Sequence, residues 1–112
     1  MDDVERFVEE ALDSLPPALQ EQLSNVEVTI EDEPPDDDPD LFGLYEGVPL
    51  TQRDAFYAGA LPDKVTIFRG PLRRSFGRDR ELLRDETIRT VLHELAHHFG
   101  IDDDRLEELG WA

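Results

Sequence analysis

His93 and His97 are the residues of this chain whose types and spacing most directly suggest chemistry. On a helix, a four-residue step places two side chains one above the other on one face, so both imidazoles can bind one metal ion. Glu94 follows the first histidine, where its carboxylate can act as the general base for a water molecule that the metal activates. The segment predicts a hydrolytic metal site, and zinc is the expected ion.

A buried helix whose histidines are satisfied by hydrogen bonds inside the core is the alternative explanation of this segment. Two neutral imidazoles and a carboxylate on one helix face are costly to bury without a cation or polar partners. We therefore favour the metal. His98 is turned about 100° away from His97 on the helix, and we expect it beside the ligands or at the surface.

A third ligand is expected after Gly100, where a left-handed glycine can end the helix and let the chain turn back. A carboxylate is an ordinary zinc ligand, and three protein ligands with one open position are typical of catalytic zinc. The chain offers three consecutive candidates: Asp102, Asp103 and Asp104. Glu107 and Glu108 are more distant choices. Asp102 looks like the N-cap of a last helix, and the alternative for Asp103 is then a first-turn acid that favours the helix dipole and has no metal role.

The segment HELAHHFGIDDDRLEELG, with its pattern His-Glu-x-x-His-x-x-Gly-x-x-Asp, resembles the small bacterial zincin-like metallopeptidases that are sometimes called minimal metalloproteases. The segments LFGLYEGVPLTQR and KVTIFRGPL resemble strands of that family, so the likeness runs from Leu41 onward. The resemblance implies a zinc peptidase with His93, His97 and Asp103 as ligands and Glu94 as the catalytic base. Met1 is the only methionine, so the methionine turn of metzincins is absent.

The helix that carries the histidines is predicted to begin near Asp79, whose side chain can cap it, and to end at Gly100. Its apolar positions cover a broad face, which predicts a central helix. These positions are Leu82, Leu83, Ile88, Val91, Leu92, Leu95, Ala96 and Phe99.

The remaining patterns predict an α+β domain, a small mixed sheet packed on the zinc helix with N-terminal and C-terminal helices. Helices are expected at 2–15, as a short turn at 18–23, and at 102–109. Strands are expected at 26–30, at 41–49 with a bend, and at 64–68. The stretches 32–40 and 70–77 read as loops, and 59–63 reads as a turn.

Two further expectations concern how a substrate would be held. Tyr45, Tyr57 and Arg53 are the available donors to an oxyanion, although a tyrosine is more often a core residue with its hydroxyl at the rim. By analogy with zincins, the strand at 64–68 could be an edge strand that accepts an extended peptide.

Composition limits the class of protein. The 112 residues predict one domain, 1–112, and a net charge of -17 argues against binding to nucleic acid or to an anionic membrane. No stretch approaches the roughly 20 apolar residues of a membrane span, and no signal peptide is recognised. The absence of cysteine fits a reducing compartment. We expect a cytoplasmic monomer with a peptide or protein substrate.

The alternative function is a non-catalytic one, a module on the same scaffold that binds a metal or a protein partner. A chain of this length has few residues with which to build the walls of a deep substrate cleft. A metal site that faces an open groove would favour the enzyme, and a site capped by the chain itself would favour the module.

Overall fold

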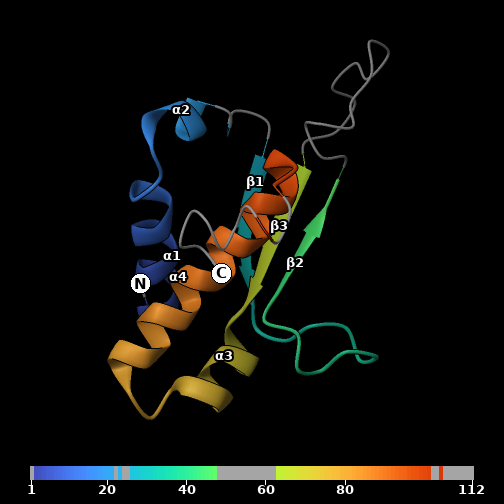
Figure 1. The fold of residues 1–112 in the computed structure, drawn as a ribbon. Helices are drawn as coiled ribbons and strands as arrows, with labels where there is room; N and C mark the ends of the chain where they lie inside the picture. Colours follow the sequence, from blue (N-terminus) through green and yellow to red (C-terminus); the bar gives the residue numbers. More distant parts are fainter. Residues whose placement is uncertain (1, 22, 24–25, 48–62, 102–103, 105–112) are drawn as a thin grey trace.

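The computed structural model describes residues 2–21, 23, 26–47, 63–101 and 104. The elements within these residues follow the chain in this order: α1 (Asp3–Asp13), α2 (Pro17–Gln20), β1 (Val26–Glu31), β2 (Gly43–Glu46), β3 (Asp63–Phe68), α3 (Arg69–Phe76) and α4 (Arg80–Phe99). The three strands form one sheet, and α4 lies between α1 and the strands β2 and β3 (Figure 1). The predicted α+β fold is confirmed.

The sheet is mixed, with the strand order β1-β3-β2. β3 runs parallel to β1 and antiparallel to β2, with Gly43 opposite Ile67 and Tyr45 opposite Val65. The expectation that the strand at 64–68 is an edge strand is therefore wrong, because β3 has a hydrogen-bonded neighbour on each side. Its almost continuous burial is typical of a central strand.

One hydrophobic core lies between the sheet and the helices. α1 contributes one amphipathic face to it, α4 contributes its apolar face, and β3 contributes Val65 and Ile67, which are both fully buried. α1 begins as its sequence predicts, because the Asp2 side chain accepts a hydrogen bond from the Glu5 backbone N–H at 2.8 Å. This core fixes α4 against the sheet.

The stretch 70–77, which was expected to be a loop, is mostly the helix α3. Pro71 lies in its first turn, where a helix does not require the backbone N–H. Pro71 and Leu72 are buried, and Leu72 belongs to the hydrophobic core. Contact with this core, which the local charge pattern does not reveal, stabilises the helix.

Other expectations fall partly outside the described residues. The loop at 32–40 contains no helix or strand, and the strand expected at 41–49 is described only as the short β2. Of the predicted turn at 59–63 only Asp63 is described, and of the predicted helix at 102–109 only Asp104. Within the described part of the chain, no helix combines the length and the apolar character that a membrane crossing requires.

Candidate metal centre

α4 holds the chemically distinctive residues, and both of its ends match the sequence prediction. The Asp79 side chain accepts hydrogen bonds from the backbone N–H groups of Glu81 and Leu82, at 3.0 and 3.3 Å. At the other end, Gly100 adopts the left-handed conformation with φ 72°, which a side chain would disfavour. The two histidines therefore lie in the last turns of a capped and well-packed helix.

His93, Glu94 and His97 form a cluster that could hold a metal ion. One ligand atom from each lies within 4.8 Å of the others, and the imidazole centroids are 5.0 Å apart. Ligands of a tetrahedral zinc ion stand about 3.4 Å apart, so side-chain rotations of His93 and His97 would let both imidazoles reach one ion, with the Glu94 carboxylate beside it. His97 is exposed, while His93 and Glu94 are half-buried. The donor types, their spacing and their access from solvent all fit zinc.

Glu94 is the residue whose acidity the site alters. Its partial burial raises the pKa of the carboxyl, and the neighbouring His97 and His93 oppose that shift. A hydrogen bond from the Tyr45 backbone N–H also favours the charged form. A carboxylate with a raised pKa accepts a proton more readily than an ordinary glutamate, as a general base requires.

The structure does not describe Asp103, the residue predicted to be the third ligand. Asp103, which the family resemblance implies, is outside the described residues, and so are Asp102, Glu107 and Glu108. Asp104 is described and is not part of the cluster found among the described residues. The assignment of Asp103 stays a prediction.

Tyr45 contacts the cluster in a different way from the one expected. Its hydroxyl donates to Asp63 Oδ2 at 2.6 Å, so the group expected to meet an oxyanion is engaged by a buried carboxylate. Its ring is stacked on His97, with centroids 6.1 Å apart and planes inclined by 13°. Tyr57 and Arg53, the other expected donors, lie outside the described residues.

His98 and Asp63 form a buried pair that the sequence did not predict. His98 Nδ1 lies 2.6 Å from Asp63 Oδ2, and the two residues are 0% and 1% exposed. His98 is therefore not a surface residue, because it faces the sheet while His97 faces solvent. No sequence signal joins the two residues, although an aspartate at the start of an apolar strand is an unusual choice.

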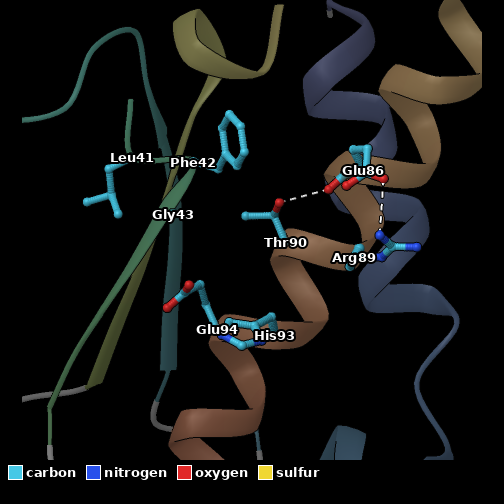
Figure 2. A pocket seen from close by; sticks show the side chains of 8 residues that line it. All are labelled: Leu41, Phe42, Gly43, Glu86, Arg89, Thr90, His93 and Glu94. Atoms are coloured by element: carbon cyan, nitrogen blue, oxygen red, sulfur yellow. Dashed lines mark hydrogen bonds and ion pairs between the residues drawn. The ribbon is translucent and has the colours of Figure 1, made fainter. Parts of the chain in front are cut away.

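A pocket of about 280 Å³ lies beside the cluster, between the start of β2 and the middle of α4 (Figure 2). In Figure 2 the Glu94 carboxylate points from α4 toward β2. Arg89 and Glu86 form an ion pair of 3.2 Å at the far side of the pocket from His93. The lining residues come from both elements: Leu41, Phe42, Gly43, Glu86, Arg89, Thr90, His93 and Glu94.

Comparisons with known proteins agree with this geometry. The model of one protein family, described as zincin-like metallopeptidase, matches residues 23–111. A search of curated proteins found no match. The matched range includes all three strands and the helix that carries His93, Glu94 and His97. The chain therefore belongs to the zincin-like metallopeptidase family.

Proposed function

We propose that this protein is a zinc-dependent peptidase in which Glu94 is the general base. The observation that carries the proposal is the position of Glu94, beside two histidines that could bind a metal and in the lining of a pocket. The proposed ligands are His93, His97 and Asp103. A bound zinc ion would supply Lewis acidity toward a peptide carbonyl and a water molecule.

The chain's own residues would perform the proton transfers. Glu94 would take a proton from the attacking water and pass it to the leaving nitrogen. Its half-buried position supports this role, because burial raises the pKa of its carboxyl. The hydrogen bond from the Tyr45 backbone N–H would keep the carboxylate directed toward β2.

Among the described strands β2 lies at one edge of the sheet, and its outer side supports binding of an extended peptide. The Phe68 backbone N–H donates to the Phe42 carbonyl at 2.9 Å, so residues 42 and 68 are a hydrogen-bonded pair. Hydrogen-bonded and non-hydrogen-bonded pairs alternate along an antiparallel ladder, so the backbone N–H and C=O groups of Gly43 and Tyr45 point away from β3. Glu94 accepts the Tyr45 N–H on this outer side. A peptide added along this edge would present its carbonyls near Glu94.

The pocket supports an enzyme more than a non-catalytic module. A module that only binds a metal needs no pocket beside its ligands, whereas a peptidase can use such a pocket for a side chain of its substrate. The pocket adjoins both His93 and Glu94. A peptide or protein therefore remains the proposed substrate.

The test compares zinc-loaded wild type with Glu94→Gln and Glu81→Gln on a peptide library. Glu81 is an exposed glutamate in the first turn of α4, so it is a matched control for the loss of one charge. We expect Glu94→Gln to keep its zinc and to lose at least about 100-fold in hydrolysis, while Glu81→Gln retains activity. Full metal-dependent hydrolysis by Glu94→Gln would refute the proposed role.

A further inference from the structure

The buried pair of Asp63 and His98 ties two elements together behind the metal centre. Asp63 is the first residue of β3, and His98 lies in the last turn of α4. Burial of a carboxylate at 1% exposure is expensive unless hydrogen bonds compensate it, and His98 at 2.6 Å is one such partner. The partner His98 therefore holds the Asp63 carboxylate at a defined position between β3 and α4.

Tyr45 brings the third element, β2, to the same carboxylate. Its hydroxyl donates to Asp63 Oδ2 at 2.6 Å, the oxygen that also contacts His98. The end of β2 leaves room for this arrangement at Gly47, where a Cβ would overlap the Asp63 carboxylate. Gly47 has φ 150°, a conformation that residues with side chains rarely adopt. The backbone directly after β2 therefore passes close to the Asp63 side chain.

Tyr45 also contacts two residues of the candidate metal centre. Its ring is stacked on His97, and its backbone N–H donates to the Glu94 carboxylate. Tyr45 is thus in contact with one candidate ligand and with the candidate base, while its hydroxyl is fixed by Asp63.

We propose that Asp63 and His98 anchor Tyr45, and that Tyr45 is a positioning residue that holds His97 and Glu94 in the geometry needed for metal binding and proton transfer. The proposal rests on the proposed function for its catalytic part. The contacts it invokes are between side chains and backbone groups of this chain, so it can be tested separately. A fixed ring restricts the rotation of the His97 imidazole, and a fixed backbone N–H restricts the Glu94 carboxylate.

Tyr45→Phe is the informative variant, because it removes only the hydroxyl and leaves the ring, the backbone N–H and the pair of Asp63 and His98. Thr66→Val is its matched control. It removes a hydroxyl from the buried strand β3, where Thr66 contacts Thr29 at 3.4 Å. By the alternation of the strand, Thr66 lies on the sheet face opposite to Val65 and Ile67, away from α4.

Three measurements decide the proposal, and none of them depends on catalysis. In metal-free protein, hydrogen exchange at the amide of residue 45 reports its bond to Glu94, and we expect Tyr45→Phe to lose protection there. Zinc affinity, measured by competition with a chelating dye, should fall about 10-fold in Tyr45→Phe and stay unchanged in Thr66→Val. The visible spectrum of the cobalt-substituted protein should change in Tyr45→Phe alone.

A lower melting temperature in Tyr45→Phe, with the amide protection, zinc affinity and cobalt spectrum of wild type, would overturn the proposal and reduce the network to a structural one. Failure of the proposed function gives a different result. In that case Glu94→Gln retains full metal-dependent hydrolysis. The differences between Tyr45→Phe and Thr66→Val in amide exchange and in zinc affinity persist.

Discussion

Gly43 on β2 faces Glu94 on α4 so closely that a Cβ at position 43 would lie 3.0 Å from the Glu94 Cγ. The same Cβ would lie 2.9 Å from the Thr90 Cγ2. Both distances are shorter than ordinary van der Waals contacts between carbon atoms. The absence of a side chain at position 43 therefore lets the strand approach the helix at the turn that carries the proposed base.

Gly43→Ala is expected to destabilise the protein by about 1–3 kcal/mol, because the added methyl group overpacks the contact with α4. It should also lower hydrolytic activity by displacing Glu94. Thr90→Ser removes the Thr90 Cγ2 methyl group, the nearest neighbour of the added Cβ. The double variant Gly43→Ala with Thr90→Ser should therefore recover part of the lost stability. Urea unfolding of the two single variants and the double variant measures this coupling. Purely additive effects would contradict the proposed contact.

Metal binding is expected to depend on the two helix histidines and on one acidic residue after the helix. His93→Ala and His97→Ala should each abolish stoichiometric zinc binding, because two ligands cannot hold the ion tightly. Asp103→Ala should do the same, with Asp104→Ala as its control on the same segment. Elemental analysis after dialysis measures the metal content. Loss of zinc in Asp104→Ala instead of Asp103→Ala would transfer the third ligand to that position.

Glu94→Gln is expected to stabilise the metal-free protein at neutral pH. Burial raises the pKa of Glu94 above the ordinary glutamate value of 4.5, so the fold favours the protonated form. As the pH rises above the ordinary glutamate pKa, the Glu94 carboxyl ionises more readily in the unfolded chain than in the folded one, so the wild type loses stability. Glutamine avoids that loss, and the difference between the two proteins should vanish below about pH 4. Urea unfolding with a chelator at pH 4 and pH 7 tests this. A less stable Glu94→Gln at pH 7 would contradict it.

Asp2 is expected to contribute stability through its charge and through its cap on α1. Burial opposes the shift, but the Glu5 N–H together with Arg69 and Arg73 lowers the pKa of Asp2 below its ordinary 3.8. This stability is present above pH 3.8 and is lost as the pH falls through the lower value in the folded protein.

Asp2→Asn and Asp2→Ala separate these two contributions. Asparagine keeps the cap and removes the charge, and since the side chain is partly exposed it should cost only about 0.5–1 kcal/mol at pH 7. Alanine also removes the cap and should cost about 1 kcal/mol more. Urea unfolding at pH 7 and pH 2.5 measures both, and the penalty of Asp2→Asn should be smaller at the lower pH. A penalty that is independent of pH would exclude the ion pairs as its cause.

The sequence alone determined the local parts of the candidate site. The spacing of His93 and His97 fixes their common face once the segment is helical, and Asp79 and Gly100 mark the helix ends through interactions with nearby backbone. Strand alternation likewise located β1 and β3. These features depend on neighbours within a few residues, which is the range over which sequence patterns carry information.

Only the tertiary structure decided which distant residues meet. The helix α3 is stabilised by the burial of Pro71 and Leu72, and β3 is the central strand because β1 and β2 pair with it on its two sides. Tyr45 and His98 reach Asp63 across 18 and 35 residues of sequence. No local periodicity encodes such contacts, since they form only when the packing of helix on sheet has brought the chain together.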